Sequence, residues 1–161
     1  MATVLWIGDQ WRLPMLRIAV NTLINRPVQE VWDFFIDLTN SPHWTASGSE
    51  LRQTSSGPPG VGMTIESVRP IFGREIKSQT IEILQYEPGR SISMTTAVPL
   101  LGRAAMRFTF ESVGGGTRLS REGELGLGRA ERLLGPILTR VLRKGWRTEM
   151  ANLKRLIEAR R

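Results

Sequence analysis

The sequence contains no cysteine and only one histidine, His43. Without cysteine there is no disulfide framework, no thiol nucleophile and no cysteine-ligated zinc or iron–sulfur centre. A single histidine that lacks a neighbouring serine, cysteine or set of metal ligands does not form a catalytic constellation, so we expect a surface or packing role for His43. Neither a cofactor nor a metal site is predicted.

Long hydrophobic runs are also absent. No stretch approaches the roughly 18 apolar residues that a membrane-spanning helix requires. The first residues carry no basic segment, and Asp9 interrupts their apolar run, which is not the pattern of a signal peptide. We therefore expect a soluble protein and take the cytoplasm as its location. With 161 residues, 40% of them hydrophobic, the chain can bury one core.

The net charge of +7 arises entirely near the C-terminus. Residues 129–161 hold ten Lys and Arg against three Asp and Glu, whereas residues 1–128 hold twelve of each. In a helix, the bases opposite the apolar stripe would be Arg140, Arg143, Lys144, Arg147 and Lys154. We interpret this face as a solvated surface, with an anionic membrane surface or an acidic partner as the alternatives. No zinc-finger spacing or aromatic stacking motif accompanies the charge, so nucleic acid is not an expected partner.

Hydrophobic periodicity predicts the order of elements. Residues 16–24 have strand character, and Val28, Val31, Trp32 and Phe35 follow at helical spacing after Pro27. Asn40, Ser41 and Pro42 interrupt this helix, and a short second helix or turn then carries His43 and Trp44. The period then changes to two, which predicts strands at 63–71, 74–86, 90–98, 103–113 and 117–127, with a further short strand at 49–54. A helix over 129–160 completes the chain, with a break or kink at Gly135–Pro136.

This order, together with "NRPVQEVWDFFIDLTNSPHW", "GVGMTI", "YEPGRSISM" and "GGTRLSREGEL", resembles the START-like helix-grip superfamily, SRPBCC, also described as the polyketide cyclase/dehydrase and lipid transport group. The resemblance covers about residues 16–160. It implies an α+β helix-grip fold: a curved antiparallel β-sheet wrapped around a long C-terminal α-helix, with two short helices after the first strand. We expect residues 15–161 to form this single domain and residues 1–14 to be an N-terminal extension.

The resemblance also implies an apolar cavity between the sheet and the last helix. The apolar side of that helix carries Val141, Leu142, Trp146, Leu153, Leu156 and Ile157. We expect Leu142, Trp146, Leu153 and Leu156 each to be largely buried. Gly145 interrupts the stripe. It either leaves space for a ligand or makes room for a bulky facing residue such as Phe108 or Phe110.

Glu149 also interrupts the apolar stripe, and an ionised carboxylate there needs a partner. In "TRLSREGEL", alternation places Arg121 on the same face as Leu119 and Leu125, which is the inward face. We therefore predict an Arg121–Glu149 pair across the cavity. The alternatives are a purely structural ion pair or a Glu149 side chain that reaches the rim.

The predicted ligand-binding residues share an inward position on a strand or on the helix. They are Met63, Ile65, Met94, Thr96, Met106, Phe108, Arg121, Leu138, Leu142, Gly145, Trp146 and Glu149. Methionines adapt to irregular ligands, although the same side chains also serve as ordinary core.

Three functions fit this pattern. The first is binding or carriage of a small hydrophobic or aromatic ligand, which needs no catalytic set. The second is a polyketide cyclase or dehydratase type of enzyme, in which Glu149 acts as general acid/base and Arg121 polarises a carbonyl. The third is peripheral membrane association, as in the lipid- and quinone-binding members of the superfamily. The fold hosts all three, and the sequence does not define the oligomeric state.

Overall fold

Strands form most of the chain and follow the alternation in the sequence. The computed structural model describes residues 15–98, 102–126 and 131–160, so the extension expected at residues 1–14 lies outside the described residues. The strands are β1 (Met15–Ile24), β2 (Glu50–Gln53), β3 (Thr64–Ile71), β4 (Arg74–Glu87), β5 (Ser91–Val98), β6 (Gly102–Val113) and β7 (Gly116–Gly126). The helices are α1 (Val28–Ile36), the 3₁₀ helix η1 (Leu38–Asn40), α2 (Ser41–Trp44) and α3 (Glu131–Glu158).

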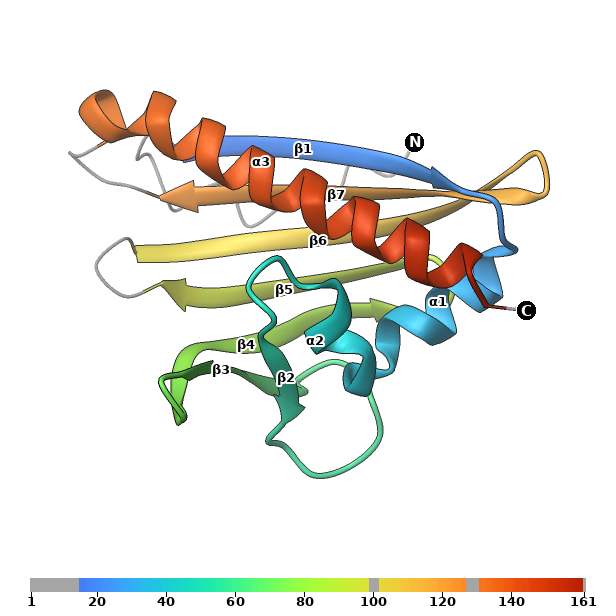
Figure 1. The fold of residues 1–161 in the computed structure, drawn as a ribbon, viewed down its shortest axis with the longest axis horizontal. Helices are drawn as coiled ribbons and strands as arrows, with labels where there is room; N and C mark the ends of the chain where they lie inside the picture. The colour runs from blue at the N-terminus through green and yellow to red at the C-terminus, as the bar shows by residue number, and fades with distance from the viewer. Residues whose placement is uncertain (1–14, 99–101, 127–130, 161) are drawn as a thin grey trace.

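The seven strands form one antiparallel sheet in the order β1-β7-β6-β5-β4-β3-β2. The first strand therefore lies beside the last, with Met15 opposite Gly126 and Ile24 opposite Thr117. Irregular register at Ser67–Val68 in β3 and at Ile83–Gln85 in β4 bends the other half of the sheet. Figure 1 shows α3 running diagonally across one face of this sheet, with α1 and α2 beside its C-terminal half.

The long helix α3 is continuous through Pro136, so a break at Gly135–Pro136 is wrong, while a kink there stays a prediction. Proline lies in only the second turn of the 28-residue helix. The first four N–H groups of a helix have no intrahelical acceptor, so a proline just beyond them removes a single backbone hydrogen bond. No helix among the described residues is long and apolar enough to cross a membrane.

An aromatic cluster fixes α1 against the sheet. The ring centroids of Trp32 and Phe110 are 5.1 Å apart, and those of Phe35 and Phe108 are 4.7 Å apart. Phe35 also stacks on Trp44 of α2 at 5.8 Å. Rings in such tilted and offset contacts bury much apolar area, so α1 and α2 are anchored at one end of the sheet. The predicted fold class, a curved antiparallel sheet around a long C-terminal helix, is confirmed.

Candidate functional site

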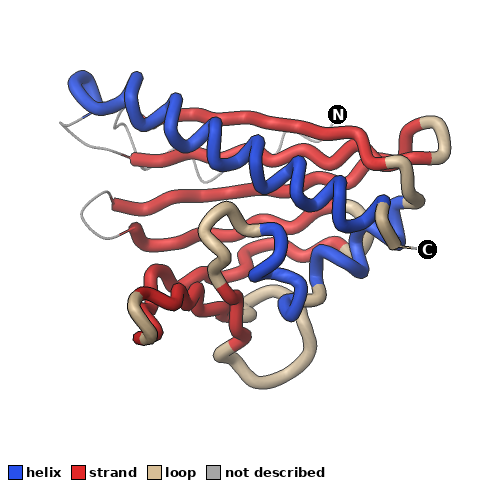
Figure 2. Tube along the Cα trace, in the orientation of Figure 1, coloured by secondary structure: helices blue, strands red, loops and turns tan. Residues whose placement is uncertain are grey.

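A cavity of about 450 Å³ lies between the sheet and α3. Alternate residues of the strands form its floor, because successive side chains in a strand point to opposite faces. Met63 directly precedes β3, and Ile65 lies on it. Met94 lies on β5, and Met106 and Phe108 lie on β6. The middle of α3 forms the roof, and the loop between α2 and β2 closes one side. Figure 2 shows this loop as the tan segment between α2 and β2, next to α3.

Ten of the twelve predicted site residues line this cavity. They are Met63, Ile65, Met94, Met106, Phe108, Arg121, Leu142, Gly145, Trp146 and Glu149. Thr96 and Leu138 do not line it. The Thr96 side chain is buried, but its hydroxyl donates to the Thr80 carbonyl oxygen at 2.9 Å, so it belongs to the sheet. Leu138 lies two turns before Trp146, in the part of α3 that precedes the cavity.

Arg121 projects from β7 and is buried, with 8% of its surface exposed. Its Nη1 donates to Glu149 Oε2, and its Nη2 lies 3.2 Å from the sulfur of Met106. The guanidinium carbon is 4.0 Å from the Trp146 ring centroid and 5.1 Å from that of Phe108, which are cation–π distances. Burial lowers the pKa of Arg121, and Glu149 opposes this shift. Because arginine starts from a very high pKa, the guanidinium stays charged.

Glu149 connects three elements. Its Oε2 accepts from Arg121 on β7, and its Oε1 accepts the backbone N–H of Ala46 at 3.2 Å. Asn152, three residues further along α3, donates to the Trp44 carbonyl oxygen at 3.3 Å. The predicted Arg121–Glu149 pair therefore exists, and it also holds the α2–β2 loop against the helix. The Arg121–Glu149 pair is nearly neutral as a unit, so this part of the cavity wall carries little net charge.

Gly145 faces open space: a Cβ atom built there would meet no atom within 4 Å apart from its chain neighbours and the backbone of its own helix. The alternative that it makes room for Phe108 or Phe110 is therefore wrong. Another glycine has that role. A Cβ on Gly123 of β7 would lie 2.4 Å from Cη2 of Trp146, so only glycine fits beneath the indole. Gly123 on the strand therefore makes room for the Trp146 side chain, whereas Gly145 on the helix leaves empty space.

The apolar stripe of α3 is less buried than expected. Leu153 is fully buried, whereas Leu142, Trp146 and Leu156 are only partly buried. Leu142 and Trp146 line the cavity, and solvent that enters it reaches them. Val141, placed on the apolar side from the sequence, is 60% exposed at the edge of the cavity. The stripe thus covers a partly open space and not a filled core.

Several lining residues were missed from the sequence. Trp44 is buried, lines the cavity and has an indole Nε1–H without a hydrogen-bond partner among the described residues. Tyr86 also lines it, and burial, followed by the charge of Asp33, raises the pKa of its hydroxyl. The aromatic nature of Trp44 and Tyr86 was the signal in the sequence that could have indicated a place in the cavity wall. Ser67, Ser78 and Gln79 add a polar wall that alternation in β3 and β4 did not indicate, because the register shifts at Ser67.

The chemistry available in the cavity is limited. Glu149 is the only carboxylate among the described residues that line it, and His43 is exposed and not part of the wall. No group of three or more His, Cys, Asp or Glu within residues 15–98, 102–126 and 131–160 could hold a metal ion.

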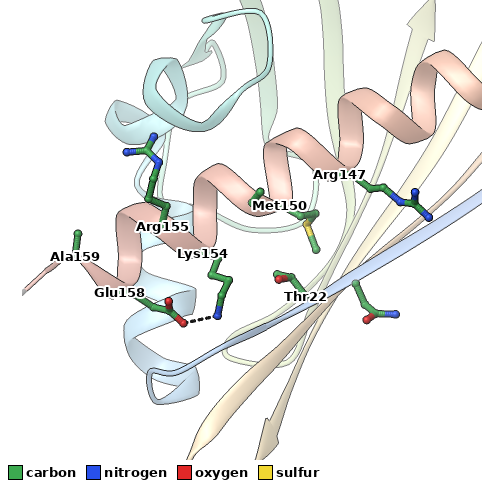
Figure 3. A pocket seen from close by; sticks show the side chains of 9 residues that line it. Thr22, Arg147, Met150, Lys154, Arg155, Glu158 and Ala159 are labelled. Atoms are coloured by element: carbon green, nitrogen blue, oxygen red, sulfur yellow. Dashed lines mark hydrogen bonds and ion pairs between the residues drawn. The ribbon is translucent and has the colours of Figure 1, made fainter.

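A second hollow, of about 530 Å³, lies outside the sheet between β1 and the C-terminal half of α3 (Figure 3). Two of its charged side chains, Lys154 and Glu158, hold α3 on β1. Lys154 pairs with Glu158 at 2.6 Å and donates to the Leu23 carbonyl oxygen at 2.6 Å. Met150, drawn beside Thr22, is buried. We therefore interpret this hollow as a groove where α3 packs on β1, with a structural role.

A curved sheet that grips a long helix over an apolar cavity is the architecture of a START-like domain. A family model described as polyketide cyclase / dehydrase and lipid transport matches residues 15–158, and the chain belongs to this family. Proteins of the family bind small hydrophobic ligands. No curated protein matches the chain in sequence.

Solved structures share the fold at low sequence identity. Ara h 8.0201 is 8% identical with a TM-score of 0.71, and the match covers 91% of this chain and 100% of that one. CalU16 from Micromonospora echinospora is 17% identical with a TM-score of 0.64, covering 89% of this chain and 76% of that one. The di-domain ARO/CYC protein StfQ of the steffimycin biosynthetic pathway is 14% identical with a TM-score of 0.71. That match covers 89% of this chain and 51% of StfQ.

Proposed function

We propose that the protein binds and carries a small hydrophobic or aromatic ligand in the cavity between the sheet and α3. The observation that carries this proposal is the open space of about 450 Å³ under Gly145, enclosed mainly by apolar and aromatic side chains. Ligand pockets of this volume and composition are common in small-molecule binding proteins. Family membership supports the class of ligand.

The polar groups suggest how such a ligand is oriented. Arg121 Nε is buried without a hydrogen-bond partner among the described residues, and so is Trp44 Nε1. Both residues line the cavity, and buried donors without acceptors are costly, so a ligand with an acceptor oxygen would be favoured. Because Glu149 already balances the charge of Arg121, a neutral carbonyl or hydroxyl oxygen suits this position better than a carboxylate.

A second candidate is a cyclase or dehydratase type of enzyme. It is supported by Glu149, a carboxylate on the cavity wall beside a guanidinium, and by the resemblance to StfQ. In this scheme Glu149 transfers protons while Arg121 polarises a carbonyl of a poly-β-carbonyl chain.

Two measurements test the proposal. Native mass spectrometry of the purified protein should detect a copurified hydrophobic molecule, and titration with the neutral fluorescent probe N-phenyl-1-naphthylamine should saturate at one site. Absence of both would contradict ligand binding. Glu149→Gln separates the two candidates: a carrier keeps its affinity for the probe, whereas an enzyme loses roughly 10²–10⁴-fold in the rate of product formation from a poly-β-carbonyl substrate.

A further inference from the structure

Two separate elements expose large apolar side chains at the same end of the molecule. On the β3–β4 hairpin these are Ile71 and Phe72, the latter fully exposed. On the first half of α3 they are Leu133, Ile137 and Val141, which are 82%, 65% and 60% exposed. We call these five residues the apolar rim. Figure 1 shows the β3–β4 hairpin and the start of α3 at the left end of the molecule.

Phe72 has an unfavourable position for a residue with only a structural role. It is the single described non-glycine residue with positive φ, at 49°, and Gly73 follows with φ of 74°. Two successive positive φ values define the tight hairpin turn that favours Asn-Gly or Asp-Gly. Phenylalanine is strained in this conformation and gains no burial in return. A contact with something outside the chain would explain its presence.

The α3 part of the rim has bases beside it. Leu133, Ile137 and Val141 follow at intervals of four, so they share one side of the helix. The adjacent exposed bases are Arg140, Arg143, Lys144 and Arg147. None of these four forms an ion pair with another residue in the described part of the chain, and no acid occurs between residues 132 and 148. Arg69 and Arg74 add positive charge at the hairpin, also without an ion pair to a described residue.

The rim borders the mouth of the cavity. The lining residues that are exposed mark where the cavity opens, and they include Arg69 on β3, Val141 on α3 and Ala46 in the α2–β2 loop. Val141 is itself a rim residue, and Arg69 is two positions from Ile71. Exposed lining residues therefore occur next to both apolar elements, and others lie in the α2–β2 and β2–β3 loops.

We propose that the apolar rim docks on an anionic lipid bilayer, with the cavity mouth facing the membrane. Exposed apolar side chains flanked by unpaired bases are what an interfacial membrane contact requires: the apolar groups enter the acyl boundary, and the bases meet anionic headgroups. A fluid bilayer can also receive apolar side chains from two separate elements, whereas a protein partner would need a continuous complementary surface. In this orientation the mouth of the apolar cavity lies against the apolar acyl region of the bilayer.

Vesicle flotation of the full chain tests the proposal. The protein should bind phosphatidylcholine vesicles that contain phosphatidylglycerol, and high salt should weaken this binding. Phe72→Asn places the preferred residue in the turn, so it should fold normally and bind roughly tenfold more weakly. Ile137→Gln should act in the same direction. The triple change Arg140→Gln, Arg143→Gln and Lys144→Gln should weaken binding on the order of 100-fold at low salt.

Matched controls lie at the opposite end of the molecule. Leu23→Gln removes an apolar side chain that is 48% exposed on β1, and Arg90→Gln with Arg155→Gln removes two exposed bases. Both variants should bind like the wild type. Failure of the wild type to bind anionic vesicles would overturn the proposal. Equal loss in the rim variants and the controls would also overturn it, since it would show a nonspecific effect of charge and apolarity.

The absence of cysteine allows a direct measurement of insertion. Phe72→Cys and Leu23→Cys can each be labelled with an environment-sensitive fluorophore at a single site. The label at residue 72 should shift to the blue on addition of anionic vesicles, while the label at residue 23 should not. Vesicle binding without a shift at residue 72, or a concentration-dependent dimer that Ile137→Gln abolishes and vesicles do not affect, would assign the rim to another contact and contradict membrane docking.

Discussion

Trp146 on α3 lies directly over Gly123 on β7, so closely that a Cβ atom at residue 123 would be 2.4 Å from the indole. The same Cβ atom would lie 3.2 Å from the Ala105 carbonyl oxygen. The indole is therefore fixed between the strand below it and the Arg121 guanidinium, which lies 4.0 Å from its ring centroid. This contact sets the height of the helix above the sheet next to the cavity.

Gly123→Ala should destabilise the protein by about 1–3 kcal/mol, because the added methyl group overpacks the contact with Trp146. Trp146 lines the cavity, so a displaced indole should also lower the affinity for N-phenyl-1-naphthylamine. Urea unfolding and a probe titration measure the two effects. Gly145→Ala is the matched control: its new methyl group meets open space, and it should stabilise the helix by about 1 kcal/mol. Equal stability of the two variants would contradict this account of Trp146.

Gly145→Leu tests whether the space under α3 is used for binding. The leucine side chain should enter the cavity without a clash and replace a poor helix former, so the free energy of unfolding should not decrease. Affinity for the fluorescent probe should fall, because the leucine side chain occupies part of the cavity volume that the probe would fill. Unchanged affinity in a folded Gly145→Leu variant would show that the probe binds elsewhere.

The Arg121–Glu149 pair should be strongly coupled. Glu149→Gln keeps the shape and the bond to the Ala46 N–H but leaves a buried guanidinium without a counter-charge, which should cost about 3–5 kcal/mol. Arg121→Met removes the cation and should also destabilise, because the Glu149 carboxylate loses its main partner. The double variant Arg121→Met with Glu149→Gln should recover much of the loss.

Urea unfolding of all four proteins gives the coupling free energy of this pair. Additive losses in the double variant would mean that the two side chains act independently. Retained stability in Glu149→Gln would mean that Arg121 is solvated through the cavity, and the pair would then matter for orientation of a ligand more than for folding.

Much of the fold could be predicted from the sequence because its elements have clear periods. The strands from Met15 to Gly126 alternate apolar and polar residues, and the inward positions of Met94, Phe108 and Arg121 followed from that alternation. The Arg121–Glu149 pair followed from electrostatics, since each charge lay on an apolar face and needed the other. Periodicity and charge are local properties that a sequence displays.

The errors arose where the answer depended on the three-dimensional arrangement. Helical spacing placed Val141 on the apolar side, but it does not tell where the helix leaves the sheet. Alternation correctly made Thr96 an inward residue, but it could not show that the hydroxyl bonds to the Thr80 carbonyl oxygen and that Thr96 does not line the cavity. Gly123 gave a signal that was not used: a glycine in a row of inward residues indicates that something bulky lies opposite.

Glu158 provides a test based on pH. Near the end of α3 its carboxylate accepts the Asn25 backbone N–H at 2.8 Å and pairs with Lys154 at 2.6 Å. The backbone hydrogen bond, followed by the bond from Lys154, lowers the pKa of Glu158 below its ordinary value of 4.5. A carboxyl group with a lowered pKa in the folded state stabilises that state fully above its ordinary pKa. The contribution is lost as the pH falls through the lowered value.

Glu158→Gln should therefore reduce the free energy of unfolding at about pH 7, and the difference from wild type should shrink as the pH falls below 4.5 and through the lowered pKa of the wild-type carboxylate. Urea unfolding at a series of pH values measures this difference. Glu87→Gln changes an exposed glutamate in the β4–β5 region and should leave stability at about pH 7 unchanged. A difference between Glu158→Gln and wild type that stays constant with pH would show that the charge of Glu158 does not stabilise the contact between the end of α3 and the segment after β1.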